Sequence, residues 1–514
     1  MRRIRPHFGQ VASCILLAAC AFLLIEVAII PITGPVLTLE QGGVFIALCL
    51  LYNLENGCRR RRKRPVLRLS ISVLTMFLTI RYLGWRIGDT LPWGFGALDL
   101  TLGLILLLAE LHGIITSLMG QIINVLPLER TAQGSGLTLS RYPTVDVLIP
   151  TLDEDPALVE TTLIAATQFE YPASRYRVCI LDDGGTEAKL ARPGAAGRAA
   201  RERAAALRRI AKTYGATYLS RPANFHAKAG NINHALSLTE GELVLILDCD
   251  HVPAADFLTR TVRFFEHDPK LFVVQTPHNF VTPDPIERNL STFEIMPTEN
   301  ELFYEVMQPG LDFWGASFFC GSAALLRRSV LEELGGMSYE SITEDAETTL
   351  KAMRAGYRTA FYNRPMVSGL QPETFAGFIL QRMRWAQGMV QIFLLDNVWR
   401  KPGLSFMQRV LFTNFAFYWL FPIARLILLI MPPLFLVFGF NIAATTPRQL
   451  LLYGLPYYAA AVLNSQYFYG RVRWPFISQI YETAQAVFLA AGMVFVLFRP
   501  RTPTFRVTPK GGRL

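Results

Sequence analysis

The sequence predicts an α/β domain with a mostly parallel sheet, inserted between α-helical transmembrane segments. Apolar stretches long enough to cross about 30 Å of hydrocarbon lie toward both ends of the chain. Between them, over residues 142–397, short β-rich runs alternate with helical stretches. This alternation is typical of a parallel sheet with right-handed crossovers, in which ligands bind at the carboxyl ends of the strands.

The composition agrees with a membrane protein that has a sizeable soluble part. Hydrophobic residues make up 51% of the 514 residues and charged residues only 18%. The net charge of +10 could indicate a nucleic-acid partner, but the densest basic run, residues 59–64, lies between two apolar segments. Such a run usually fixes membrane orientation, so we expect no nucleic acid. The seven cysteines include no C-x-x-C pair, which favours a reducing compartment around the soluble part.

Residues 1–140 are predicted to form a membrane region with four helices. The helices are expected over residues 11–31, 36–54, 67–87 and 97–123. The N-terminus resembles a signal peptide, but no clear cleavage pattern follows it, so we expect a retained anchor. A cytoplasmic position for the basic run also places the residues after the fourth helix, and hence the domain over residues 141–400, in the cytoplasm.

A second membrane region is predicted over residues 401–498. We expect one span over residues 410–440, broken at Pro422, Pro432 and Pro433, and another over residues 450–469. The apolar stretch 484–498 is shorter and has basic residues on both sides, so it is expected to lie in the membrane interface rather than to cross. Residues 499–514 form a cytoplasmic tail.

Four strands are expected, over residues 145–149, 176–181, 243–247 and 271–275. Two carboxylates follow the strand 243–247. Side chains two apart on a strand point the same way, so Asp248 and Asp250 should converge beyond the strand's end. Such a pair commonly seats a hard divalent cation with phosphate oxygens as further ligands.

Polar tips also end the first two strands, at residues 151–154 and 182–185. An acidic tip can accept hydrogen bonds from a uracil N–H or from ribose hydroxyls, and glycines permit close backbone approach. A lone D-D-G sequence is equally compatible with an ordinary turn. Three such tips on one edge are harder to explain as turns.

Two further segments have an ordinary and a functional interpretation. Lys228 opens a helix and could meet a diphosphate near the helix's positive end, or could be a surface lysine. Thr343-Glu344-Asp345 precedes a helix that it could merely cap, or Asp345 could be a general base. Glycosyl transfer with inversion is a single displacement that needs one base and a charge sink for the leaving diphosphate.

Two basic segments of the domain also need an interpretation. The segment 381–385 offers a tryptophan as a platform for a sugar ring and an arginine for a diphosphate, or an aromatic and basic anchor at a membrane interface. The Ala/Arg-rich segment 195–212 is expected to be an exposed helix whose arginines are solvated.

In order, these motifs resemble those of processive family 2 glycosyltransferases, in particular bacterial cellulose synthase catalytic subunits. The resemblance rests on Asp182-Asp183-Gly184, Asp248-Cys249-Asp250, Gln275-Thr-Pro-His278, Phe318-Phe-Cys320-Gly-Ser322, Thr343-Glu344-Asp345 and Gln381-Arg-Met-Arg384-Trp385. It implies a cytoplasmic GT-A domain that polymerises glucose from UDP-glucose into β-1,4-glucan. It also implies a channel of helices through the bacterial inner membrane and a periplasmic cellulose synthase subunit as partner.

The same resemblance implies a role for each site residue. Asp248 and Asp250 would hold UDP and Mg²⁺, with Mn²⁺ as an alternative, and Lys228 would assist at the diphosphate. The catalytic carboxylates would be Asp345, as base, and Asp183, which with Asp182 would contact the uridine. The remaining substrate-binding residues would be Thr151, Glu154, His278, Cys320, Glu344, Gln381, Arg384 and Trp385.

The chain departs from the family pattern at two places. Relatives usually read Ser/Thr-Tyr-Asn-Glu where this chain has Thr151-Leu152-Asp153-Glu154, so the aromatic residue that would stack on uracil is missing. Residues 505–511 resemble the family's gating loop through Phe505, Val507, Thr508 and Lys510. Relatives continue into further spans and a PilZ domain, whereas this sequence stops at Leu514, so we expect no cyclic di-GMP site in it.

Two alternative hypotheses remain beside the UDP-glucose polymerase. One is a related polysaccharide synthase that uses another nucleotide sugar, such as a mannose or N-acetylglucosamine donor, or makes mixed-linkage glucan. The other is an inactive truncated remnant that acts only as a membrane subunit. A non-processive lipid-linked sugar transferase fits less well, because it would not need the 381–385 group beside a channel.

Overall fold

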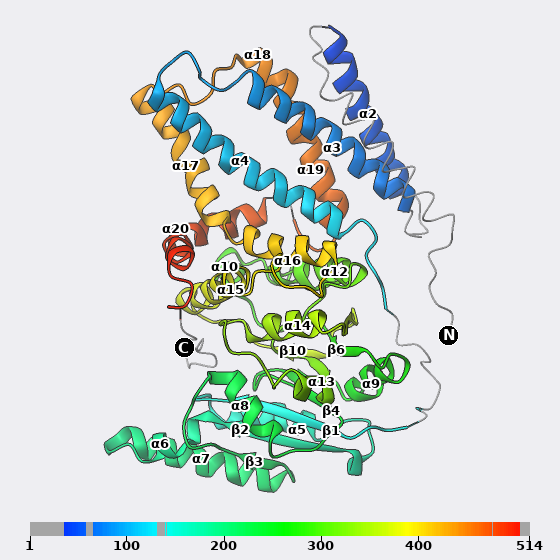
Figure 1. The fold of residues 1–514 in the computed structure, drawn as a ribbon, viewed down its shortest axis with the longest axis vertical. Helices are drawn as coiled ribbons and strands as arrows, with labels where there is room; N and C mark the ends of the chain where they lie inside the picture. The colour runs from blue at the N-terminus through cyan, green and yellow to red at the C-terminus, as the bar shows by residue number, and fades with distance from the viewer. Residues whose placement is uncertain (1–34, 58–64, 131–138, 140, 475, 504–514) are drawn as a thin grey trace. The chain divides into compact units, whose positions relative to one another are not determined.

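A computed structural model describes residues 35–57, 65–130, 139, 141–474 and 476–503. The chain divides into two compact units, Met1–Leu126 with Leu420–Ala486, and Pro127–Trp419 with Val487–Leu514. We call the first the membrane unit and the second the catalytic unit, and Figure 1 shows their helices and strands.

The catalytic unit is built on a seven-stranded sheet with strand order β3-β2-β1-β4-β8-β6-β9. Strands β1, β2, β3 and β4 are mutually parallel neighbours, and β8 alone runs antiparallel, between β4 and β6. The bounds are β1 Val145–Thr151, β2 Tyr176–Asp182, β3 Thr217–Leu219, β4 Leu243–Ile246, β6 Leu271–Gln275, β8 Ala324–Arg327 and β9 Arg358–Phe361. The four strands expected from the sequence are all present, in the mostly parallel sheet that was predicted.

Both faces of this sheet are covered, which explains why its strands are apolar without interruption. Val147 of β1 and Leu245 of β4 pack in one core together with residues of α5 (Pro156–Ala166), α7 (Gly194–Thr213) and α9 (Phe257–His267). Leu148 and Ile246, their neighbours in sequence, pack in the opposite core with residues of α8 (Ala227–Leu236), α13 (Arg328–Glu333) and α14 (Glu344–Arg354). The alternation follows from the two-residue repeat of a strand, and it directs the strand tips to one edge.

The catalytic unit contains further helices. Their bounds are α6 Glu187–Leu190, α8 Ala227–Leu236, α10 Pro285–Leu290, α11 Glu299–Glu301, α12 Gln308–Phe313, α13 Arg328–Glu333, α14 Glu344–Arg354, α15 Phe375–Leu395 and α16 Phe406–Tyr418. A π-helix, Leu302–Met307, joins α11 to α12. A second sheet of three short strands has the order β5-β10-β7, with bounds Val252–Pro253, Val367–Gly369 and His278–Phe280.

The membrane unit contains long apolar helices. Its helices are α2 Pro35–Gly57, α3 Pro65–Gly88, α4 Ala97–Ile123, α17 Phe421–Phe438, α18 Pro447–Gln449 and α19 Leu455–Tyr469, and the boundary between the units falls inside α20 Ile477–Phe498. In the described part of the chain, five helices are long and apolar enough to cross a bilayer: α2, α3, α4, α17 and α20. The chain is therefore membrane-associated. The predicted span 11–31 and the basic run 59–64 lie outside the described residues.

Two buried arginines of the membrane unit are paired with glutamates. Arg81 of α3 contacts Glu40 of α2 at 2.7 Å, and Arg86 of α3 contacts Glu110 of α4 at 2.7 Å. Both arginine side chains are buried. Pairing is the expected condition for charged groups inside a membrane protein, where an isolated charge is costly.

The structure changes two of the bounds predicted for the second membrane region. Residues 410–440 are not one span, because α16 ends at Tyr418 and α17 begins at Phe421 with Pro422 in its first turn, a position that suits proline. The stretch 484–498 belongs to a longer helix, which begins at Ile477 and is long and apolar enough to cross a bilayer. Its position in the membrane interface stays a prediction. The charged residue Glu482 interrupts the apolar pattern, so the sequence places the start of this helix too late. The Glu482 carboxylate is paired with Arg425.

Candidate functional site

The three polar strand tips lie on one edge of the main sheet, as the sequence predicted. Strand β1 lies between β2 and β4 and is parallel to both. Thr151 at the end of β1 is in register with Asp182 at the end of β2, and β4 ends two residues before Asp248. The polar residues that follow these strands therefore surround a common region, as expected at the carboxyl edge of a parallel sheet.

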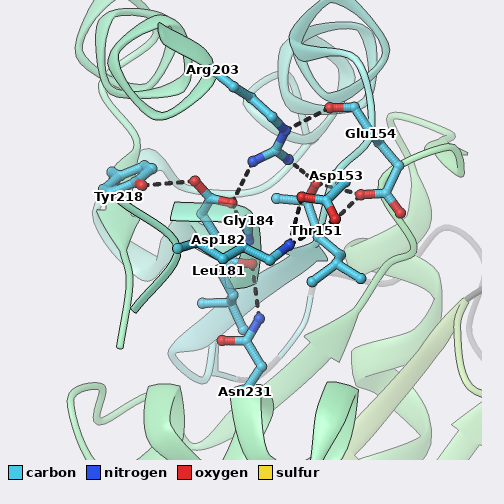
Figure 2. Close-up of polar contacts among 11 residues, drawn as sticks. Thr151, Asp153, Glu154, Leu181, Asp182, Gly184, Arg203, Tyr218 and Asn231 are labelled. Atoms are coloured by element: carbon cyan, nitrogen blue, oxygen red, sulfur yellow. Dashed lines mark hydrogen bonds and ion pairs between the residues drawn. The ribbon is translucent and has the colours of Figure 1, made fainter. Parts of the chain in front are cut away.

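At the tip of β2, the Asp182 carboxylate is hydrogen-bonded to three other groups of the protein, as Figure 2 shows. Its carboxylate accepts hydrogen bonds from the Gly184 N–H at 2.9 Å, from Arg203 Nη1 at 2.6 Å and from the Tyr218 hydroxyl at 2.7 Å. The side chain is fully buried. Direct contact of Asp182 with a uridine stays a prediction.

Asp183, the next residue, is paired with an arginine that the sequence reasoning missed. Arg221 Nε and Nη2 donate to the two carboxylate oxygens of Asp183 at 2.6 and 2.7 Å. Burial raises the pKa of Asp183, and the hydrogen bonds and charge of Arg221 oppose the rise. A buried bidentate pair is a rigid arrangement, so a proton-transfer role for Asp183, like its uridine contact, stays a prediction.

At the tip of β1, the Glu154 carboxylate binds two groups of the same turn. Glu154 Oε2 accepts hydrogen bonds from Thr151 Oγ1 at 2.7 Å and from the Leu152 N–H at 2.6 Å. Asp153, which with Leu152 departs from the family pattern, is paired with Lys189 of α6 at 2.6 Å. The predicted nucleotide-binding residues of this tip are therefore held in a compact turn.

Beyond β4, three side chains can hold a metal ion. Asp248, Asp250 and His251 each offer a ligand atom, and these atoms lie within 4.8 Å of one another. Ser322 supports the group, because its Oγ accepts the Asp248 N–H at 2.8 Å and lies 2.7 Å from His251 Nδ1. Two carboxylates and an imidazole fit a divalent cation. His251 was not predicted, although it directly follows Asp250 in the sequence.

Lys228 lies beside this group, as the sequence suggested. Its Nζ is hydrogen-bonded to Asp248 and donates to the Gly321 carbonyl at 2.7 Å. The two residues before it, His226 and Ala227, have positive φ angles of 58° and 44°, which turn the chain sharply into α8. Burial acts to lower the pKa of Lys228, but the nearby carboxylates of Asp248, Glu344 and Asp345 outweigh it and raise the pKa. The lysine is therefore a stable cation.

Asp345, in the first turn of α14, also lies near Gly321. A Cβ added to Gly321 would lie 3.1 Å from Asp345 Oδ2 and 3.7 Å from Lys228 Nζ, so the glycine keeps this space open. Burial raises the pKa of Asp345 to about 7, and the Glu344 carboxylate adds to the rise. The hydroxyl of Thr343 makes no cap hydrogen bond to the helix. A carboxylate that titrates near neutral pH is suited to general-base catalysis.

A set of buried polar groups extends the site away from Lys228. His278 Nε2 lies 2.9 Å from the Ser322 carbonyl, and its Nδ1 lies 2.8 Å from the hydroxyl of Tyr304. Burial raises the pKa of Tyr304, and the charges of Cys320 and Asp345 add to it. Tyr304 was not predicted. It belongs to the π-helix 302–307, a distortion often found at functional sites.

Two more predicted residues belong to this region: Cys320 is partly buried and Glu344 is buried. Cys320 Sγ accepts a hydrogen bond from Gln308 Nε2 at 3.3 Å, and burial raises the pKa of its thiol well above the usual value. Burial also raises the pKa of Glu344, against the charges of Lys228 and Arg384. The side chains of Cys320 and Glu344 therefore belong to the same buried cluster as Asp345.

The segment 381–385 forms part of α15, and its spacing places it on the face of that helix that meets α14. Gln381, Arg384 or Trp385, and Gly388 follow one another at three- or four-residue intervals. A Cβ on Gly388 would lie 2.4 Å from Thr343 Cγ2, so this face of α15 packs directly before Glu344 and Asp345. The charge of Arg384 acts to lower the pKa of Asp345. Phe505, Val507, Thr508 and Lys510 lie outside the described residues.

Comparisons with known proteins agree with this fold. The family described as "Glycosyl transferase family 2" matches residues 146–335, and "Glycosyl transferase family group 2" matches residues 243–471. A solved mannosyltransferase of Pyrobaculum calidifontis, in complex with GDP-Man and Mn²⁺, covers 77% of this chain and 99% of its own, with a TM-score of 0.52 and 22% identity. This likeness concerns the fold, and it confirms the expected GT-A architecture.

Two relatives align along nearly the whole chain. The cellulose synthase catalytic subunit [UDP-forming] of Pseudomonas fluorescens is 38% identical over 98% of this chain and 64% of its own length. Cellulose synthase 2 of Novacetimonas hansenii is 37% identical over 99% of this chain and 30% of its own length. The chain thus spans less than two thirds of the relatives it matches. It is a homologue of the bacterial cellulose synthase catalytic subunits, and two family 2 glycosyltransferase models match it over residues 146–335 and 243–471.

Proposed function

We propose that this chain is a processive, inverting glycosyltransferase that polymerises glucose from UDP-glucose into β-1,4-glucan and extrudes it across the bacterial inner membrane. The observation that carries the proposal is the position of Asp345. This partly buried carboxylate, with a pKa of about 7, faces the same glycine as Lys228, which is itself bonded to Asp248. A base and a cationic centre therefore flank one small space. The name of the Pseudomonas relative supports the donor and the product.

In this proposal the donor binds along the edge of the sheet. The tips of β1 and β2, with Thr151, Glu154 and the Asp182–Asp183 pair, receive the uridine. Lys228 and Arg384 carry the positive charge that the leaving diphosphate requires. A divalent cation held by Asp248 and Asp250, Mg²⁺ in our proposal with Mn²⁺ as the alternative, would add positive charge there.

The acceptor binds on the side of Asp345. Asp345 takes the proton of the acceptor hydroxyl while that oxygen attacks the anomeric carbon, and the bond to UDP breaks on the opposite face of the sugar. One displacement inverts the configuration, so one base is sufficient. Trp385 and Gln381 on α15, with Cys320 and His278, line the acceptor side, where a tryptophan can stack on a sugar ring.

The membrane unit would provide the route for the polymer. The proposal places the catalytic unit in the cytoplasm, because the basic run 59–64 lies between two apolar segments. A periplasmic cellulose synthase subunit would then receive the glucan on the other side.

The donor is tested with a panel of UDP-glucose, UDP-N-acetylglucosamine and GDP-mannose, supplied to the detergent-solubilised full chain with Mg²⁺. We expect UDP-glucose to be turned over at least about tenfold faster than the others, since each polar contact that a wrong sugar or base leaves unmade costs about 1–3 kcal/mol. The alternative donors belong in the panel because Leu152 and the Asp153–Lys189 pair change the tip of β1. Faster turnover of another donor would assign the chain to a related synthase.

Gly388→Ala tests the packing of α15 against the base. The added methyl group would collide with Thr343, at 2.4 Å, and displace the residues that follow. We expect kcat to fall about 10- to 100-fold, because small displacements of catalytic groups cost that much. Binding of UDP, measured by calorimetry, should stay unchanged. Gly113→Ala in α4, where nothing lies within 4 Å of the added Cβ, is the control. Unchanged kcat in Gly388→Ala would contradict this packing role.

A further inference from the structure

Arg203 lies on the helix α7, whose arginines the sequence suggested were solvated. Its side chain is only 12% exposed. It shares a face of α7 with the buried Leu207 and Ala211, four and eight residues further on. Arg203 is therefore directed toward the sheet, and this exception overturns the prediction of a wholly solvated basic face.

The guanidinium of Arg203 connects two strand tips. Nε donates to the Glu154 carbonyl at 2.8 Å and Nη2 to Thr151 Oγ1 at 2.8 Å, both at the tip of β1. Nη1 donates to Asp182 Oδ1 at 2.6 Å, at the tip of β2. Figure 2 shows Arg203 between these groups. Three donors in a planar guanidinium hold the tips of β1 and β2 at a fixed distance from each other, which a single ammonium group could not do.

Gly184 and Gly185 leave room for these contacts because they have no side chain. A Cβ on Gly184 would lie 1.7 Å from the Leu152 carbonyl oxygen and 2.4 Å from Arg203 Nη1. A Cβ on Gly185 would lie 2.3 Å from the Tyr218 hydroxyl and 2.4 Å from Asp182 Oδ2. The close approach that the D-D-G-G sequence permits is thus an approach of the protein's own groups, packed around the contact between Arg203 and Asp182.

We propose that Arg203 is a positioning residue for the nucleoside end of the donor site. It fixes the separation of the β1 and β2 tips and the orientation of Asp182, and it acts through them rather than on the reacting atoms. The inference rests on the proposed function, because it assumes that a nucleoside diphosphate binds at this edge. It concerns donor affinity and leaves the chemistry at Asp345 to other residues.

The test compares donor affinity with turnover in the purified full chain. Arg203→Ala should raise the Kd of UDP, measured by calorimetry with Mg²⁺, and the KM for UDP-glucose by about tenfold, the effect expected for loss of charge-assisted hydrogen bonds. The kcat at saturating UDP-glucose should stay within about twofold, because binding energy lost equally in ground and transition states leaves kcat unchanged. Arg203→Lys should give an intermediate Kd. Arg209→Ala, an exposed arginine on the same helix, should match the wild type.

A second variant guards against a folding defect. Tyr218→Phe removes one hydrogen bond from Asp182 while keeping the ring, and it should raise the Kd of UDP by about two- to fivefold. Wild-type Kd values in Arg203→Ala, or in both Arg203→Lys and Tyr218→Phe where Arg203→Ala fails to fold, would overturn the assignment. A lower kcat with an unchanged Kd would overturn it as well. If the wild type itself binds no UDP, the proposed function fails and the role of Arg203 falls with it.

Discussion

Asp345→Asn should abolish glucan synthesis while UDP still binds. An amide cannot accept the acceptor's proton, and loss of a general base typically costs about 10²–10⁴-fold in rate. The substitution keeps the size of the side chain and its acceptor for the Ala346 N–H, at 2.8 Å in the wild type. We therefore expect the Kd of UDP to remain within about twofold of the wild-type value, the limit for a residue that acts on the transition state. Polymer made at the wild-type rate by this variant would remove Asp345 from the mechanism.

The pH dependence of the wild type should report the same group. The folded structure raises the pKa of Asp345 to about 7, chiefly by burial, so its carboxyl is protonated and inactive as a base at lower pH. The kcat/KM should therefore rise as pH increases through about 7 and level off above it, because this ratio follows the ionisation of the free enzyme. A profile already flat from pH 5 upward would contradict a base with a raised pKa.

Asp248→Asn and Asp250→Asn should each remove most of the activity by weakening the metal site. Each loses one anionic ligand of a divalent cation, and Asp248→Asn also deprives Lys228 of its partner. We expect turnover to fall at least about 100-fold, comparable with the loss of an electrostatic catalytic group. The measurement is turnover of UDP-glucose over a range of Mg²⁺ and Mn²⁺ concentrations. Glu202→Gln, an exposed carboxylate of α7, is the control.

Removal of the cation provides the matching experiment on the wild type. Chelation by EDTA should stop turnover, and added Mg²⁺ or Mn²⁺ should restore it. Full activity in excess EDTA would contradict a catalytic role for the metal site. Asp250→Asn with wild-type metal dependence would show that the ligands are other side chains.

The parts of the fold that could be predicted are those in which one physical signal dominates. Strands β1, β2 and β4 were evident from uninterrupted apolar runs because both faces of the sheet are buried. Their acidic tips could be placed on one edge because parallel neighbours end together. Lys228, Asp248 and Asp345 were found through these tips and a helix start, although they come from distant parts of the sequence.

Residues whose role depends on a contact distant in sequence were missed. Arg203 is one of several arginines in α7, and only its spacing from Leu207 and Ala211 distinguishes it. Arg221 follows β3, a three-residue strand that was not predicted, and Tyr304 lies in the π-helix 302–307, so no predicted strand tip connects them to Asp183 or His278. The helix α20 was placed too late because Glu482 interrupts the apolar run, and its partner, Arg425, lies 57 residues earlier.

The central claim is that this chain builds β-1,4-glucan from UDP-glucose with Asp345 as the base. It is tested most directly by supplying radiolabelled UDP-glucose and Mg²⁺ to membranes that contain the full chain, and by digesting the product with cellulase. We expect label in an insoluble polymer that cellulase releases as cellobiose, with none from Asp345→Asn. Label that appears only in lipid, in short soluble oligosaccharides or in a polymer resistant to cellulase would contradict the claim.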